Sequence, residues 1–304
     1  MMRSLIISLL LVLPLTVIGA ENNWSGDIEL NVGYNDNIYY QANDIEIVNN
    51  GIEQNTDVQN QFIFGSYYKF LDRKNSDMKL IVDYFHESYS ENEIETSITT
   101  ATLPYTYYTY SNRVRITPLL SRYVIDGDAA LLTTGSSFDI THKMGRYNLG
   151  ATYQYLSKSS LSSSYDKYQG AGQDLNIHYS GRWFKQYFKL SAGAYSNAYD
   201  ETVDGDESHE GVYASASYVM RRKGAELALY GKVKTKDYVT DPFNGFNRSD
   251  VNSSLSITPS YAITKATSAY ANVQWTKNSS NQNDESDNMN YTQTVTSIGF
   301  KYAF

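Results

Sequence analysis

Apolar and polar residues alternate along most of the chain from residue 24 onward, in segments of about ten residues. In the first segment, Leu30 and Val32 share one face, while Asp27, Glu29 and Asn31 share the other. Strict alternation of this kind is typical of a β-strand that has an apolar environment on one side and a polar one on the other. Helical spacing is hardly seen, so the pattern predicts an all-β fold.

The connections between these segments are alternately short and long. Short turns are expected at 72–76, 143–146, 221–224 and 264–267, and long polar stretches at about 36–56, 158–170, 199–210, 239–250 and 279–290. Tight turns at one end and longer loops at the other are typical of outer-membrane barrels. We therefore predict a transmembrane antiparallel up-and-down β-barrel over residues 21–304. A soluble β-sandwich is the alternative that would give the same alternation.

The segments number about fourteen, an even count that places both chain ends on the periplasmic side. The alternation is weakest between residues 97 and 130, where Pro104 and Pro118 interrupt it. Because proline cannot donate to a ladder of hydrogen bonds, barrels of twelve or sixteen strands remain as alternatives.

The N-terminal residues have the order of a secretory signal peptide. Arg3 precedes an apolar run from Leu5 to Leu13, and Ala20 offers a small residue for cleavage. The run is shorter than the roughly 20 apolar residues of a membrane-spanning helix. We expect residues 1–20 to be removed on export and the mature chain to reside in the outer membrane of a Gram-negative bacterium.

Composition supports a barrel and disfavours some partners. The chain has 29 Tyr, 11 Phe and no Cys. Outer-membrane barrels place aromatic residues in girdles at both membrane interfaces and need no disulfides. The net charge of −8 argues against a nucleic-acid partner.

The last strand carries an aromatic stripe in which Ile298, Phe300, Tyr302 and the terminal Phe304 alternate with smaller or polar residues. This stripe resembles the signal by which the barrel-assembly machinery recognises outer-membrane proteins. The resemblance implies that this machinery is a partner during biogenesis.

The alternation also predicts charged side chains in the lumen, because a Lys or Arg at mid-depth in lipid costs roughly 2–4 kcal/mol. The candidate selectivity residues are Asp27, Glu29, Asp83, Glu87, Arg113, Arg115, Lys189, Lys232, Lys234 and Lys236. We expect the lysine triplet and the two arginines to form a basic wall that faces the acids of the first and third strands. The alternative is that these charges pair and fill the interior.

The outer loops are acidic, for example at Asp204, Asp206 and Glu207. They suit contact with lipopolysaccharide through divalent cations, although no calcium-loop spacing is present; the alternative, which the sequence favours, is that they are solvated loop acids. The four His residues show no partners for a catalytic set or a metal centre, with His209 expected in an acidic loop and only His178 facing inward. We expect no enzyme activity and no cofactor.

The stretch Gly33-Tyr34-Asn35-Asp36-Asn37-Ile38 resembles the start of the barrel in two groups of outer-membrane proteins. These are the surface lipoprotein assembly modifiers and the porin-like barrels of exopolysaccharide systems. The first group normally carries a helical-repeat domain that this chain lacks. The leading hypothesis is a porin-like channel for small polar solutes. The alternatives are a translocation or assembly factor with a lipoprotein or polysaccharide client, and a structural or adhesive barrel.

Overall fold

The computed structural model describes residues 23–37, 56–90, 92, 95–184, 186–200, 208–238, 248–281 and 290–304. Its elements are β1 (Trp24–Asn35), β2 (Asp57–Arg73), β3 (Ser76–Tyr89), β4 (Glu95–Thr102), β5 (Tyr105–Tyr108), β6 (Asn112–Ile125), β7 (Asp128–Met144), β8 (Tyr147–Ser160), the 3-10 helix η1 (Ser163–Tyr168), β9 (Gly170–Trp183), β10 (Gln186–Tyr199), β11 (His209–Arg222), β12 (Ala225–Tyr238), β13 (Ser249–Ala262), β14 (Thr267–Ser280) and β15 (Tyr291–Ala303). The predicted signal peptide and most of the predicted acidic loop residues lie outside the described residues.

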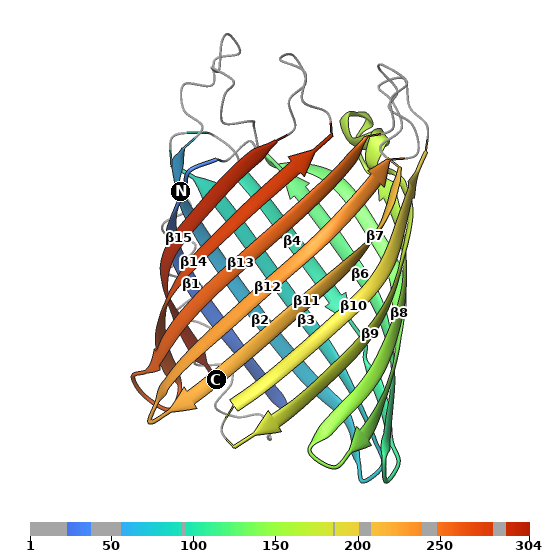
Figure 1. Ribbon diagram of the computed structural model, residues 1–304, viewed down its shortest axis with the longest axis vertical. Helices are drawn as coiled ribbons and strands as arrows, with labels where there is room; N and C mark the ends of the chain where they lie inside the picture. The colour runs from blue at the N-terminus through green and yellow to red at the C-terminus, as the bar shows by residue number, and fades with distance from the viewer. Residues whose placement is uncertain are drawn as a thin grey trace.

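The strands form one closed antiparallel barrel (Figure 1). Apart from β4 and β5, each strand pairs with its neighbours in the chain, and β1 pairs with β15 to close the cylinder. Segments β4 and β5 both lie between β3 and β6, so together they occupy a single position in the wall. The fifteen segments therefore make a barrel of fourteen strands, and the predicted fold class and strand number are confirmed.

The interruption between β4 and β5 falls at Leu103 and Pro104. At this point Pro104 lies beside Pro118 of the neighbouring strand β6. The Leu103 amide donates to the carbonyl of Pro118 across the wall, at 3.1 Å. Because the amide and carbonyl of one residue in an antiparallel strand point to the same neighbour, the missing N–H of Pro118 also faces this break. Pro118 was expected to interrupt its own strand, but β6 continues through it and Pro118 pairs with Ser136.

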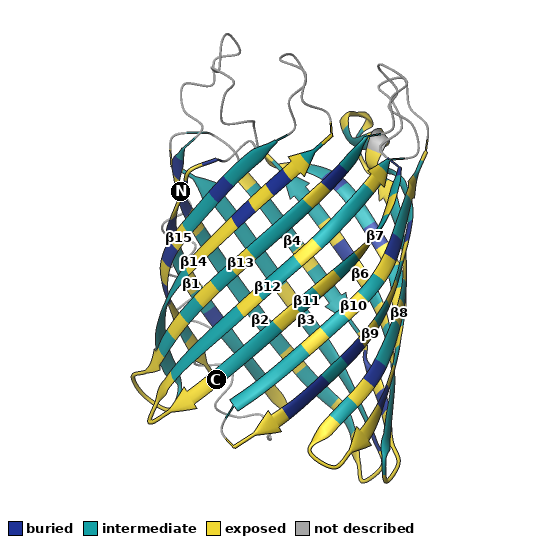
Figure 2. Cartoon of the chain, viewed as in Figure 1, coloured by how far each residue is buried: buried dark blue, intermediate teal, exposed yellow. Residues whose placement is uncertain are grey.

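The barrel has almost no apolar interior. Among the described residues, the buried apolar ones are Ile28, Ala130 and Tyr195. Large apolar side chains instead stand on the outer face, such as Ile177 at 58% exposure and Ile298 at 66%. Figure 2 shows accordingly that most of the strand surface is intermediate or exposed. A soluble sandwich would bury one apolar face of each sheet, whereas this arrangement requires lipid around the cylinder.

The two ends of the barrel differ as expected. Short turns close one end, among them Lys223–Gly224, where both residues have positive φ (46° and 84°). Positive φ at both central residues suits the right-handed twist of a two-residue hairpin. In outer-membrane barrels such turns face the periplasm, and we call this end the periplasmic end. The opposite end also has one tight turn, Asp126–Gly127, with φ of 51° and 84°.

Within the described part of the chain, no helix has the length and apolar character needed to cross a membrane.

Candidate functional site: the barrel lumen

The register between strands decides which side chains face the lumen. Directly paired residues share a face, and following the pairs from β1 to β15 gives one continuous inner set. All ten candidate selectivity residues belong to this inner set. The register thus fixes their place, while their part in selectivity stays a prediction.

The acidic side chains of β1 and β3 are held by neighbours in the wall. Asp27 forms a salt bridge with Lys301 at 2.8 Å, and Glu29 accepts a hydrogen bond from the Tyr270 hydroxyl at 2.5 Å. Charge-assisted bonds of this kind are the stronger ones in proteins. These two acids therefore brace the barrel as well as lining it.

Farther along β3, two more acids face the lumen. Asp83 lies level with Asp27 on either side of Gly65, which has no side chain to separate them. Glu87 accepts hydrogen bonds from the amides of Gln59 and Gln61. Neutral amides leave its negative charge uncompensated, so this part of the wall keeps an acidic character.

Two of the predicted lysines stand over tyrosine rings. Lys232 Nζ lies 4.8 Å from the centre of the Tyr213 ring, and Lys234 Nζ lies 3.8 Å from that of Tyr195. The Tyr213 hydroxyl in turn donates to Asp174 Oδ1 at 2.9 Å. A cation is attracted to the negative face of an aromatic ring, so these contacts hold both ammonium groups at the wall and leave their charge in the lumen.

Two cavities lie against this lysine-bearing wall. One, of about 370 Å³, is lined by Asp174, Lys189, Tyr213 and Lys232 among others. The second, of about 180 Å³, shares Asp174, Tyr213 and Lys232 and adds Lys234. The shared residues make one continuous recess that a solute in the lumen would pass. Lys236, the third residue of the triplet, pairs with Asp250 in the register.

The two arginines of β6 lie elsewhere, near the periplasmic end. Arg113 donates from Nη2 to Asp139 Oδ1 and to Thr141 Oγ1, both at 3.0 Å. Arg115 donates from Nε to Thr106 Oγ1 at 3.2 Å. Strand β12 is separated from β6 by five strands, β7 to β11. The lysine triplet and the two arginines are therefore not neighbours, and the expected basic wall of these five residues is wrong.

Sequence reasoning did not anticipate how many tyrosines face inward. Tyr195, Tyr213 and Tyr270 occupy inner positions, whereas the aromatic excess had been assigned to the membrane interfaces. Each lies over a glycine of a neighbouring strand: Tyr195 over Gly211, Tyr213 over Gly193 and Tyr270 over Gly299. The alternation itself could have found them, because these tyrosines occupy the same alternate positions of their strands as the charged residues that face the lumen.

The position of His209 was also predicted wrongly. It begins β11 and faces the lumen, with its ring centre 5.8 Å from that of Tyr195. His178 faces inward as predicted, beside Gly150. In the described ranges, no group of three or more His, Asp or Glu residues could hold a metal ion.

The C-terminal stripe lies at the seam where the barrel closes. Ile298, Phe300 and Tyr302 face outward and are 46–66% exposed. Phe304 exchanges two backbone hydrogen bonds with Gly26, at 2.9 and 3.1 Å, and its ring covers that glycine. The residue proposed as an assembly signal is thus also the last contact of the closing strand.

We expect the Phe304→Ala variant to reduce the amount of folded barrel in outer membranes roughly tenfold, because it removes both the terminal aromatic and the cover of Gly26. The measurement is the heat-modifiable band on a gel of isolated outer membranes. Phe184→Ala, which removes an 88% exposed aromatic from a periplasmic turn, is the control and should assemble normally. Normal assembly of Phe304→Ala would contradict the assigned role.

Comparisons with known proteins bear on the fold. No protein-family model matches the sequence, and no curated protein does. The barrel resembles two solved structures of OmpT, an outer membrane protein of Vibrio cholerae: a loop L8 deletion mutant and the in-vitro folded protein. Each has a TM-score of 0.52 and 6% sequence identity, over 93% of this chain and 98% and 97% of the respective OmpT chain. The chain has the fold of a transmembrane outer-membrane β-barrel.

Proposed function

We propose that the protein is exported with removal of residues 1–20, inserts into the outer membrane, and acts as a porin-like channel for small polar solutes. The observation that carries the proposal is the separation of the two faces of the wall. The outer face is apolar, while the inner face carries charges of both signs. A filled structural barrel would neutralise its interior by packing side chains across it. Here Lys232 instead rests on Tyr213 of the adjacent β11, and Lys234 rests on Tyr195 of β10, the next strand along the wall.

The arrangement also indicates how the channel would treat charge. Strand β12 lies nearly across the barrel from β3, since five strands separate them on one side and seven positions on the other. The lysines of β12 and the acids Asp83 and Glu87 of β3 thus face each other across the lumen. A transverse field of this kind orients dipolar solutes and aligns charged ones during passage. We assign no enzymatic step to the lumen.

The test is single-channel conductance of the purified protein in a planar bilayer. We expect steady openings, and we expect the Lys232→Glu, Lys234→Glu, Lys236→Glu variant to lower the ratio of anion to cation permeability roughly threefold or more, because charge rings along a pore set its ion preference. The matched control reverses three exposed cations in periplasmic turns, Arg222, Lys223 and Lys265, and should change the ratio little.

A silent bilayer from a correctly folded barrel would overturn the channel proposal. It would favour an assembly or translocation factor with a lipoprotein or polysaccharide client. The surface display of lipoproteins and polysaccharide in a deletion strain would then be the next measurement.

A further inference from the structure

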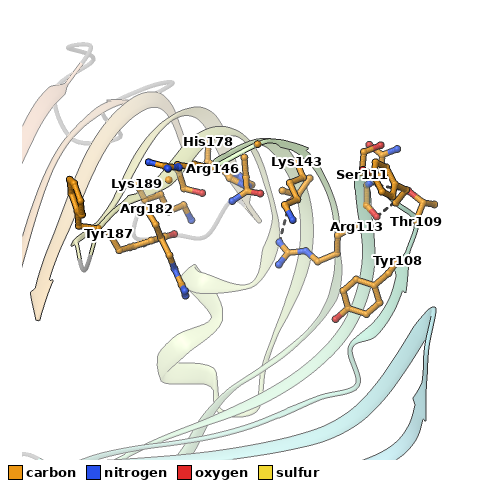
Figure 3. A pocket seen from close by; sticks show the side chains of 18 residues that line it. Tyr108, Thr109, Ser111, Arg113, Lys143, Arg146, His178, Arg182, Tyr187 and Lys189 are labelled. Atoms are coloured by element: carbon orange, nitrogen blue, oxygen red, sulfur yellow. Dashed lines mark hydrogen bonds between the residues drawn. The ribbon is translucent and has the colours of Figure 1, made fainter.

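A further cavity lies on the inner wall at the periplasmic mouth. Its volume is about 990 Å³, at the upper end of the range for small-ligand sites. It extends over the ends of β5 to β10, and five of its lining residues are cations: Arg113, Lys143, Arg146, Arg182 and Lys189. In Figure 3, Lys189, Arg182 and Arg146 form one group, and Lys143 with Arg113 forms a second.

The charges of this cavity are poorly balanced. No Asp or Glu is among its lining residues. In the part of the chain that the structure describes, Arg113 is the one cation of the five that takes part in a salt bridge, with Asp139. Like charges brought together inside a concave wall raise the local potential and attract counter-ions. A bound anion would remove this unfavourable energy.

Two buried nitrogens at the cavity also lack partners within the described residues. They are His178 Nδ1 and Arg113 Nε. His178 is 92% buried, since 8% of its surface is exposed, and it lines the cavity. Because these two atoms have almost no accessible surface, a solute in the open cavity would contact the exposed cations Lys143, Arg146 and Arg182 and not the buried nitrogens.

We infer that this periplasmic vestibule is a binding site for a small multivalent oxyanion, that is, an organic solute with two or more carboxylate or phosphate groups. Arginine guanidinium groups suit such oxygens because their donors match the two acceptors of a carboxylate or phosphate. A multivalent anion is favoured because a single charge would leave most of the five cations uncompensated. At the rim, Tyr187 offers a hydroxyl and a ring face to the rest of the solute, and Tyr108 offers its ring face, since its hydroxyl donates to Asp77.

The cavity is connected with the two recesses of the lysine-bearing wall. The cavity shares Lys189 with the 370 Å³ recess, which shares Lys232 with the next recess toward the outer end. A continuous line of cationic and tyrosine side chains therefore leads from the outer half of the lumen to the vestibule. The inference goes beyond conduction, because anion binding at the mouth can be measured whether or not the barrel carries current.

The experiment is titration of the full-length processed protein in detergent, by calorimetry at constant ionic strength, with citrate and inorganic pyrophosphate as probes. We expect submillimolar binding of both, and a tenfold or greater loss of affinity in Arg146→Glu, Arg182→Glu. The matched control is Arg73→Glu, Lys74→Glu, which makes the same charge change on another turn of the same rim, at residues that do not line the cavity, and should alter affinity less than twofold. Spermidine and chloride should show no binding.

Three results would overturn the inference: no binding of either probe to folded wild-type protein, equal loss in the control variant, or unchanged affinity in Arg146→Glu, Arg182→Glu. Heat-modifiable migration of each variant on a gel establishes that it is folded before titration. Failure of the channel proposal looks different, because a silent bilayer with intact citrate binding would leave this site in place. Conductance without binding would remove the site and keep the channel.

Discussion

Replacing Val273 with lysine is expected to destabilise the barrel by roughly 2–4 kcal/mol, whereas the same replacement at the adjacent Gln274 should cost little. Both residues lie at the middle of β14, at the same depth in the membrane. Val273 pairs with the outward Ile257, and Gln274 pairs with the inward Ser256. The first lysine would be forced into lipid, and the second would enter the polar lumen.

The pair forms its own control, because the two variants add an identical charge to the same strand and differ only in the face. The measurement is the free energy of unfolding in urea from lipid vesicles, with the heat-modifiable band as a check of folding. Equal stabilities of the two variants would contradict the assignment of inner and outer faces, and with it every lumen residue named above.

The second large effect is expected at the seam, where Gly299→Val should destabilise the barrel by about 3 kcal/mol. The Tyr270 ring crosses Gly299 to reach Glu29, so one side chain links β14, β15 and β1. A Cβ on Gly299 would lie 2.4 Å from the Tyr270 ring. The ring must then move away, and its hydrogen bond to a carboxylate is lost.

Gly231→Val is the matched control, since the nearest atom to a Cβ there is 3.9 Å away. Tyr270→Phe separates the two contributions, because it removes the hydroxyl and keeps the ring over Gly299; we expect it to cost less, about 2 kcal/mol. Urea unfolding again gives the values. A Gly299→Val barrel as stable as Gly231→Val would show that the tyrosine does not brace the seam.

Much of the fold was predictable from the sequence because alternation has a simple physical cause. Every second residue of a membrane strand faces lipid, and lipid tolerates few polar groups. The faces of β1, β9, β12 and β13 follow directly from it. The region of Pro104 and Pro118 was harder, since two prolines remove the donors by which a strand is normally defined. Whether Pro104 and Pro118 lie beside each other depends on the register between their strands, and the alternation does not specify that register.

The candidate site was predictable in part, for a related reason. The alternation of positions along a strand tells which side chains face inward, and it placed Lys232 and Arg113 correctly on the inner face. It does not tell which of them come close, because that depends on the tilt of the strands and on the number of strands between them. The vestibule of Arg146, Arg182 and Lys189 joins residues from different turns and strands. Arg146 lies in the predicted turn 143–146 and Arg182 lies near the end of β9, so neither stands out in the sequence as part of a site.

The break at Leu103 and Pro104 also gives the cylinder an uneven stiffness. Elsewhere each strand is bonded along its length to both neighbours, so a lateral load from the bilayer is shared around the circumference. Between β3 and β6 the load passes through two short segments that meet end to end. We expect the wall to yield first along this strip when the thickness or curvature of the membrane changes, while the strands that bear the lysines and the seam keep their shape.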